Sequence, residues 1–411
     1  MDDSLDLRPI DADEFPAFGH SMYQTFGGDL RDDDLEADRW VFEPDRSLAT
    51  FADKRVVSTA AIFSRRMTVP GGELPVAAVT MVSVSPTHRR QGILRSMMRR
   101  QLTELHDEGR EPVAALWASE GTIYGRFGYG LAARRARFTG DTQSLTVPRD
   151  ADDGAGRMRM VSLDEARPHL ASIYDAVRTG QNGWLDRPGR WWDHRLYDPS
   201  HARSGATALR CAIYEQAEGA VAGYVVYRIK EEWGDAGNQS VVQVQELTAT
   251  TPQAYAATWR FILDLDLIRR VVKRIVPVDE PLQHIVTDPN AVQLSVSAGL
   301  WVRLVDVDRA LSARRYATDV DVVLDVTDDF CPWNSGRLRL SAGPQGAACT
   351  PTKDAPDLEL AAVDLGAAYL GGTTLQTLAA AGRVRERRPG ALLAASQAFA
   401  GAREPWCPEV F

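Results

Sequence analysis

Three arginines and one glycine lie between an apolar segment and a helical one, a combination suited to binding a pyrophosphate. Apart from Ser83, residues 79–84 are apolar or β-branched, as in a buried strand, and Pro86 ends that strand because proline cannot donate to the ladder. From Arg89 the chain turns into a helix, with Gly92 where the backbone must come close to a ligand. A helix start attracts anions through its unpaired N–H groups and its dipole, and arginine side chains add cationic charge.

The predicted pyrophosphate site comprises the strand end and the helix start, namely Val82, Ser83, Val84, Arg89, Arg90, Gln91, Gly92, Ile93, Leu94 and Arg95. A charged strand-to-helix connection without a ligand would have the same residue types, so the pattern alone leaves both interpretations open. The order V-S-V-x-P-x-x-R-R-Q-G-I-L resembles the acetyl-CoA pyrophosphate loop of GNAT N-acetyltransferases, usually (Q/R)-x-x-G-x-(G/A). Arg89, Gly92 and Leu94 occupy its diagnostic positions, and the leucine departs from the usual small residue.

A second block, Ala118-Ser-Glu-Gly-Thr-Ile-Tyr-Gly-Arg-Phe-Gly-Tyr-Gly130, follows another apolar segment at residues 112–117. Together with H-R-R-x-G-x-L-R upstream and a phenylalanine at the last position, it resembles the Eis (enhanced intracellular survival) family of bacterial acetyltransferases. In that family the loop carries a leucine. The resemblance covers the whole chain in length and layout, and it is strongest at residues 74–134.

The resemblance implies a mixture of α/β and α+β folds in three parts. Residues 1–148 resemble a GNAT domain that binds acetyl-CoA, residues 157–305 a second GNAT-like domain, and residues 306–411 a sterol-carrier-protein-like α+β domain. The polar, glycine-bearing run at 149–157 is typical of a linker. Where the first part has its arginine and glycine loop, the second has residues 248–253, T-A-T-T-P-Q, which offer neither residue type to a pyrophosphate. We therefore expect that only the first part binds acetyl-CoA.

Acetyl transfer from a thioester to an amine needs a group that protonates or stabilises the leaving thiolate. Tyr124 is a candidate acid, because it follows Ser119 and Glu120 at the end of an apolar strand, where the thioester sulfur would lie. Tyr129 is its rival, and either tyrosine is also typical of aromatic packing beside F-G-Y-G. The Eis resemblance implies that Tyr124 is the general acid. Ser119 and Glu120 are expected at the cofactor, although Glu120 could instead attract the amine or cap a turn.

No histidine or glutamate of the first domain stands out as the base that deprotonates the amine. The Eis resemblance implies that the α-carboxylate of the last residue, here Phe411, reaches the active site of the first domain. Residues 406–410, W-C-P-E-V, are unlike a polar, frayed tail, and desolvation raises the pKa of a carboxylate. Glu409 is expected to attract the cationic substrate. Phe26 and Trp117 are expected to line its pocket, although a tryptophan at a strand end is also typical of a core.

Composition restricts the partners that the chain can bind. A formal net charge of −9 opposes nucleic-acid binding and mildly favours a cationic substrate. No apolar run reaches the roughly 20 residues that span a bilayer, and the acidic start is unlike a signal peptide. The histidines form no metal-ligand pattern, so no metal is expected. We expect reduced, mostly buried thiols in a cytoplasmic protein, because the cysteines are widely spaced: Cys211, Cys331, Cys349 and Cys407.

These observations predict a cytoplasmic GNAT N-acetyltransferase of the Eis type. It would transfer an acetyl group directly from acetyl-CoA to a primary amine of a cationic small molecule. The resemblance further implies a homohexamer and aminoglycosides as a substrate class. Two alternatives stay open: a protein lysine as acceptor, which an open groove would favour, and a non-catalytic module that binds lipids or other hydrophobic molecules. The intact loop at 89–94 argues against the second alternative.

Overall fold

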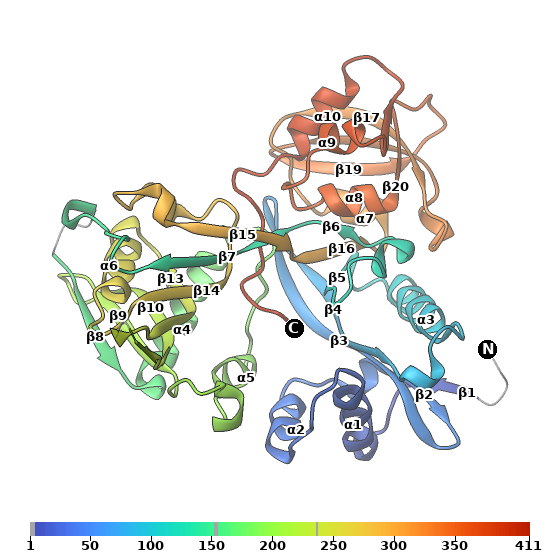
Figure 1. The fold of residues 1–411 in the computed structure, drawn as a ribbon. Helices are drawn as coiled ribbons and strands as arrows, with labels where there is room; N and C mark the ends of the chain where they lie inside the picture. The colour runs from blue at the N-terminus through green and yellow to red at the C-terminus, as the bar shows by residue number, and fades with distance from the viewer. Residues whose placement is uncertain (1–4, 152–154, 236) are drawn as a thin grey trace. The chain divides into compact units, whose positions relative to one another are not determined.

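The computed structural model describes residues 5–151, 155–235 and 237–411, which form two compact units (Figure 1). The first unit contains the described residues up to Ala133, together with Gly299–Pro405 and Val410–Phe411. The second unit contains Arg134–Ala298 and Trp406–Glu409. The chain therefore leaves the first unit after residue 133, returns at residue 299, and divides its last residues between the two units.

The first unit contains a seven-stranded sheet in which only the β4–β5 pair is parallel. Two helices, α1 (Phe15–Thr25) and α2 (Asp32–Arg39), precede its second strand. A third helix, α3 (Ile93–Glu108), places Met98, Leu102 and Leu105 on one face and buries them against Val79 and Ala114 of the sheet. The strands, in spatial order, are β1 (Leu5–Arg8), β2 (Ser47–Ala52), β3 (Arg55–Val69), β4 (Gly72–Val84), β5 (Val113–Trp117), β16 (Leu300–Leu304) and β6 (Gly130–Leu131).

The second unit contains another seven-stranded sheet, again with one parallel pair, β13 with β14. Its helices are α4 (Leu163–Arg178), α5 (Trp191–Leu196) and α6 (Pro252–Leu263), and a small hairpin joins β11 (Trp233–Gly234) to β12 (Gly237–Asn238). The strands, in spatial order, are β15 (Gln293–Ala298), β7 (Arg134–Asp141), β14 (Arg270–Val276), β13 (Val241–Ala249), β10 (Val221–Lys230), β9 (Arg210–Glu215) and β8 (Arg157–Val161).

The two sheets exchange strands, which the predicted boundaries at 148 and 305 do not follow. β7 belongs to the predicted first domain, yet it pairs with β14 and β15 of the second sheet (Figure 1). β16 belongs to the predicted second domain, yet it pairs with β5 and β6 of the first sheet. An apolar strand pattern indicates that a strand is buried but not which strand it pairs with.

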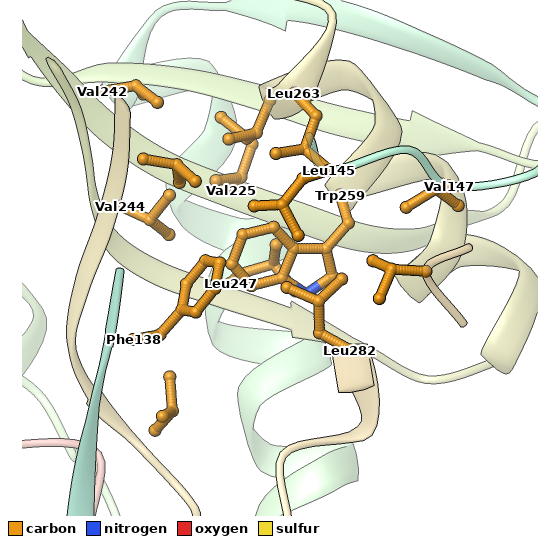
Figure 2. Packing of buried hydrophobic residues seen from close by; sticks show 14 of the residues in the cluster. Phe138, Leu145, Val147, Val225, Val242, Val244, Leu247, Trp259, Leu263 and Leu282 are labelled. Atoms are coloured by element: carbon orange, nitrogen blue, oxygen red, sulfur yellow. The ribbon is translucent and has the colours of Figure 1, made fainter. Parts of the chain in front are cut away.

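Burial of Phe138 fixes β7 in the second sheet. Its ring meets that of Trp259 on α6 edge to face, with centroids 5.4 Å apart, and both side chains are fully buried (Figure 2). Val225, Val242 and Leu282 complete the same cluster. Burial of this apolar surface drives the exchanged strand into its place.

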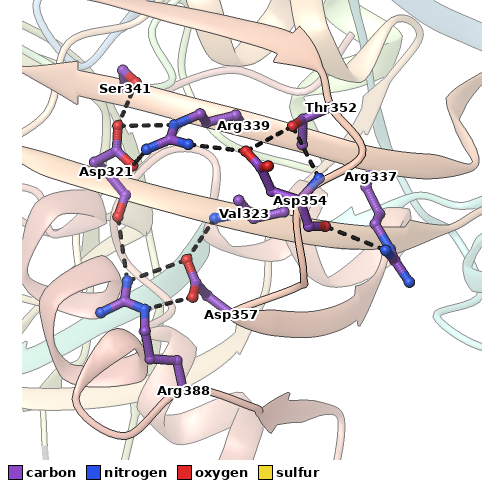
Figure 3. Close-up of polar contacts among 9 residues, drawn as sticks. All are labelled: Asp321, Val323, Arg337, Arg339, Ser341, Thr352, Asp354, Asp357 and Arg388. Carbon is purple, nitrogen blue, oxygen red and sulfur yellow. Dashed lines mark hydrogen bonds and ion pairs between the residues drawn. The ribbon is translucent and has the colours of Figure 1, made fainter.

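The last part of the first unit is an α+β fold with a five-stranded sheet. One surface of this sheet is polar: Arg339 bridges Asp321 and Asp354, and Asp357 pairs with Arg388 while accepting the backbone N–H of Val323 (Figure 3). Exposed ion pairs of this kind add little stability. The helices are α7 (Val307–Ser312), α8 (Ala362–Ala368), α9 (Leu375–Ala380) and α10 (Ala391–Phe399), and the strands in spatial order are β19 (Gly346–Pro351), β18 (Gly336–Gly343), β17 (Val320–Thr327), β20 (Leu358–Ala361) and β21 (Val384–Glu386).

The sequence predicted buried, reduced cysteines and no membrane-spanning segment. All four cysteines are buried and unbridged. Within the described ranges, no helix is both long and apolar enough to cross a membrane.

Helix α8 approaches the first sheet so closely that only glycine fits at the contact. A Cβ atom on Gly130 would lie 2.2 Å from the carbonyl oxygen of Val363 and from the backbone nitrogen of Ala367. A Cβ atom on Gly366 would lie 2.4 Å from the carbonyl oxygen of Val302. Backbone atoms cannot move aside like the end of a flexible side chain, so this contact joins α8 rigidly to β6 and β16.

We therefore expect Gly130→Ala to lower the free energy of unfolding by about 1–3 kcal/mol, the usual cost of overpacking. The measurement is the thermal denaturation midpoint of the full chain. Gly72→Ala is the matched control, because a Cβ atom there meets nothing within 4 Å. Equal midpoints for the two variants would contradict the close contact.

Candidate active site

The candidate site begins where two parallel strands of the first sheet separate. β4 and β5 pair only over Val76–Ala78 and Val113–Ala115. β4 continues to Val84 and β5 to Trp117, with no further pairs between them. Their carboxyl ends therefore leave space inside the sheet, and such strand ends are where α/β sheets commonly bind ligands.

A β-bulge in β4 accompanies this separation. Thr59 of β3 pairs with Ser83, but Ala61 pairs with Thr80, and Met81 between them has a φ of 52°. A positive φ is unfavourable for methionine, so the surrounding structure must hold it. The buried Thr59 hydroxyl does so, because it donates to the Met81 carbonyl at 2.7 Å and accepts from the Ser83 hydroxyl at 2.7 Å.

The predicted pyrophosphate loop lies directly beyond β4. A 3₁₀ turn, Pro86–His88, leads to Arg89, Arg90 and Gln91, which are all exposed. Gly92 is the N-cap of α3 with a φ of 84°, in the left-handed region that favours glycine. No side chain caps this helix start, so its first N–H groups face an exposed arginine-rich turn.

The structure separates the predicted loop residues into two groups. Arg89, Arg90, Gln91, Gly92 and Arg95 are exposed around the helix start and can meet an anion. The others hold the loop in place: Ile93 is buried, Leu94, Val82 and Val84 pack beside it, and the hydroxyl of Ser83 is bonded to Thr59.

A pocket of about 230 Å³ lies at the separated strand ends, entirely within the first unit. It brings together residues from α1, β4, β5, the following turn and the end of the chain. Six predicted site residues line it: Phe26, Val82, Trp117, Ser119, Tyr124 and Phe411. Glu120 is exposed and does not line it.

Sequence reasoning missed six further residues of the lining. Met22 could have been found, because it precedes Phe26 by four residues and so shares its face of α1. Met81 had no sequence signal, because the bulge that turns it depends on β3. The missed residues are Met22, Val79, Thr80, Met81, Leu116 and Val410.

Tyr124 and Tyr129 have different environments. Tyr124 begins a 3₁₀ turn, Tyr124–Phe127, and lines the pocket; burial raises the pKa of its hydroxyl to about 12, with a smaller contribution from the charge of Glu120. Tyr129 lies behind it, fully buried, with ring centroids 5.9 Å apart. Burial also raises the pKa of Tyr129, whose hydroxyl has no hydrogen-bond partner among the described residues. Both phenols stay protonated at neutral pH, but only Tyr124 faces the pocket.

The last three residues of the sequence have different positions. Phe411 is half-buried and lines the pocket, as does the exposed Val410. Glu409, predicted to attract the substrate, does not line this pocket. Its side chain is buried in the second unit, where its carboxylate accepts from Nε of Arg187 at 2.7 Å. The predicted attraction of the substrate by Glu409 stays a prediction, and its carboxylate is paired with Arg187.

The corresponding helix start in the second unit is closed. Thr251 is the N-cap of α6, and its hydroxyl accepts the backbone N–H of Ala254 at 3.1 Å. Pro252, the first helical residue, has no N–H to offer. This helix start therefore offers fewer free N–H groups than the start of α3, and residues 248–253 include no arginine.

Comparisons with known proteins match three successive parts of the chain. Residues 6–132 match the model of an acetyltransferase (GNAT) domain, residues 183–309 match a second GNAT-domain model, and residues 307–408 match a sterol carrier protein domain. An uncharacterized N-acetyltransferase of Streptomyces avermitilis is 43% identical over 413 residues, which cover 99% of this chain and 100% of the relative.

N-acetyltransferase Eis of Mycobacterium tuberculosis is 37% identical over 353 residues, which cover 84% of this chain and 83% of the relative. The chain belongs to the Eis family. The crystal structure of Eis1 from Mycobacterium abscessus agrees, with a TM-score of 0.85 and 33% identity over 99% of this chain and 100% of that one. The predicted Eis resemblance is thus confirmed, together with tandem GNAT folds, a sterol-carrier-type domain and an N-acetyltransferase activity.

Replacing Gly92 in this Eis-family loop by valine should raise KM for acetyl-CoA by about tenfold or more and change KM for the amine little. A side chain at this position keeps the phosphates from the backbone and disfavours the positive φ. Steady-state kinetics with each substrate varied in turn give both values.

Gly109→Val is the matched control, because Gly109 ends the same helix with a φ of 65°. It introduces similar backbone strain away from the loop and should leave KM for acetyl-CoA unchanged. A comparable rise in both variants would attribute the effect to strain in α3 instead of to the loop.

Proposed function

We propose that this Eis-family enzyme transfers the acetyl group of acetyl-CoA directly to a primary amine of a cationic small molecule, with aminoglycosides as a candidate class. The observation that carries the proposal is the single pocket lined by Tyr124, Ser119 and Phe411 at the separated ends of β4 and β5. It brings together Tyr124, the proposed proton donor, and Phe411, which carries the proposed base, in the unit that also contains the arginine-rich start of α3.

The loop residues suit the pyrophosphate of acetyl-CoA. Arg89, Arg90 and Arg95 supply charge-assisted hydrogen bonds, and Gly92 lets phosphates approach the N–H groups of α3. The pantetheine arm would then follow the open edge of β4, past the bulge at Met81, towards the pocket. The closed start of α6 supports a single donor site, in the first GNAT fold.

In the proposed reaction, the α-carboxylate of Phe411, the last residue of the sequence, accepts a proton from the substrate ammonium, directly or through water. The freed amine attacks the thioester carbonyl, so the carbon–nitrogen bond forms and the carbon–sulfur bond breaks. Tyr124 donates its proton to the departing thiolate, and the second amine proton is lost to solvent. The raised pKa of Tyr124 keeps this donor protonated across the neutral range.

The proposed acceptor is a primary amine of a cationic small molecule. The net charge of −9 supports a cationic acceptor. A panel of aminoglycosides, polyamines and lysine-containing peptides, assayed for thiol release from acetyl-CoA, tests both acceptor classes. Turnover confined to peptides would favour the protein-lysine alternative, and no turnover with any amine would contradict the proposed function.

We also propose a cytoplasmic homohexamer, as the family resemblance implies. Light scattering tests the assembly, and cell fractionation tests the location.

Tyr124→Phe keeps the ring and removes the proton, so it should lower kcat by about 10²–10⁴-fold with little change in acetyl-CoA binding. Tyr129→Phe is the matched control, since it removes the neighbouring buried hydroxyl, which has no partner among the described residues. If Tyr124→Phe loses less than about threefold while Tyr129→Phe is strongly impaired, the acid is Tyr129.

Appending a short Gly/Ser segment after Phe411 should abolish turnover and leave the fold and acetyl-CoA binding intact. The extension converts the α-carboxylate of Phe411 into an amide, which accepts no proton at neutral pH. The same segment placed before Met1 is the control and should be harmless. Turnover above about half of the unextended protein would rule out the carboxylate as the base.

A further inference from the structure

The second unit contains a buried ion-pair cluster centred on Arg187. The guanidinium group donates from both terminal nitrogens to the carboxylate of Glu246, at 2.9 and 2.8 Å, and from Nε to Glu409 at 2.7 Å. Its carbon lies 3.9 Å from the ring centre of Tyr174 and 4.8 Å from that of Trp192. Arg187 is therefore held by two carboxylates and two aromatic rings, all within this unit.

The segment that carries Glu409 is fixed at its other end as well. Trp406 meets the ring of Trp184 edge to face at 5.1 Å, and its backbone N–H donates to the carbonyl of Asn182 at 3.1 Å. Nζ of Lys273 lies 5.3 Å from the Trp406 ring centre. Residues 405–409 are all buried, whereas Val410 is exposed. The tail is thus buried and anchored up to Glu409, and Val410 is the first exposed residue after this anchor.

Only two residues separate this anchor from the end of the sequence. A residue of extended chain spans at most about 3.6 Å, so the Cα atom of Phe411 lies no more than about 7 Å from that of Glu409, and the carboxylate of Phe411 no more than roughly 9–10 Å. A base must stay within hydrogen-bond reach of its proton, and an unanchored chain end would spend most of its time elsewhere. The Glu409 ion pair therefore limits where the terminal carboxylate can be.

We propose that Arg187 and Glu409 are positioning residues, which hold the tail so that the α-carboxylate of Phe411 is available as the base. This inference rests on the proposed function of Phe411. Glu409 then acts through Phe411 instead of contacting the substrate.

Glu409→Gln is the informative variant, because it removes one charge while Arg187 keeps its two-point pairing with Glu246. Substituting Arg187 would leave the buried Glu246 with only Arg195 and Tyr224 as partners among the described residues, and would destabilise the unit. We expect kcat for the amine to fall by about tenfold or more, with KM for acetyl-CoA within about twofold of the unchanged protein and the thermal midpoint nearly unchanged. Glu409→Asp keeps the charge and should recover part of kcat.

Glu404→Gln is the matched control, since it removes an exposed carboxylate from the same tail, upstream of the anchor. It should leave kcat unchanged. Unchanged kcat in Glu409→Gln would overturn the inference, as would a loss that Glu409→Asp does not relieve or that comes with an equal rise in KM for acetyl-CoA. If the C-terminal extension abolishes turnover while Glu409→Gln is neutral, the positioning role of Glu409 is contradicted and the role of Phe411 as the base is supported. If the extended protein keeps its turnover, both the role of Phe411 as the base and the positioning role of Glu409 are contradicted.

Discussion

The separation of β4 from β5 is the constraint on which the first acetyltransferase fold depends. Hydrogen bonds between neighbouring parallel strands would otherwise fill the space in which the pocket lies. The bulge at Met81 accompanies this separation with an unfavourable backbone conformation, which the Thr59 hydroxyl stabilises from the adjacent strand. The pocket, the open strand edge and the direction of the loop all follow from this local loss of pairing.

The two GNAT folds differ in the backbone N–H groups that the start of one helix offers to an anion. α3 begins with a glycine that exposes N–H groups beside arginines, whereas in α6 Thr251 caps one N–H group and Pro252 removes another. The capped start stabilises the helix by about 1 kcal/mol, which the open start forgoes unless a ligand binds. The first fold therefore retains an exposed polar surface that the second has replaced with a self-sufficient helix end.

Sequence patterns predicted what is local in this chain. The strand, loop and helix around Gly92 and the turn around Tyr124 are contiguous, so their geometry follows from propensities and backbone chemistry. The exchanged strands and the bulge at Met81 depend on partners far away in the sequence, and an apolar run does not identify its partner. The ion pair of Glu409 could not be predicted for the same reason: nothing near this residue in the sequence indicates that Arg187 is its counter-ion.

The strand exchange also governs how this protein can fold. In the first sheet, β16 lies between β5 and β6. One edge of β5 therefore stays unpaired until residues 300–304, far along the chain, pair with it, as Leu300 does with Trp117. Contacts so distant in sequence slow folding, because a long loop must close before they form. During synthesis the nascent first fold exposes an unpaired strand edge until β16 emerges, by which time most of the second sheet is already made. Because each sheet takes a strand from beyond the other, no single cut in the chain separates the two GNAT folds.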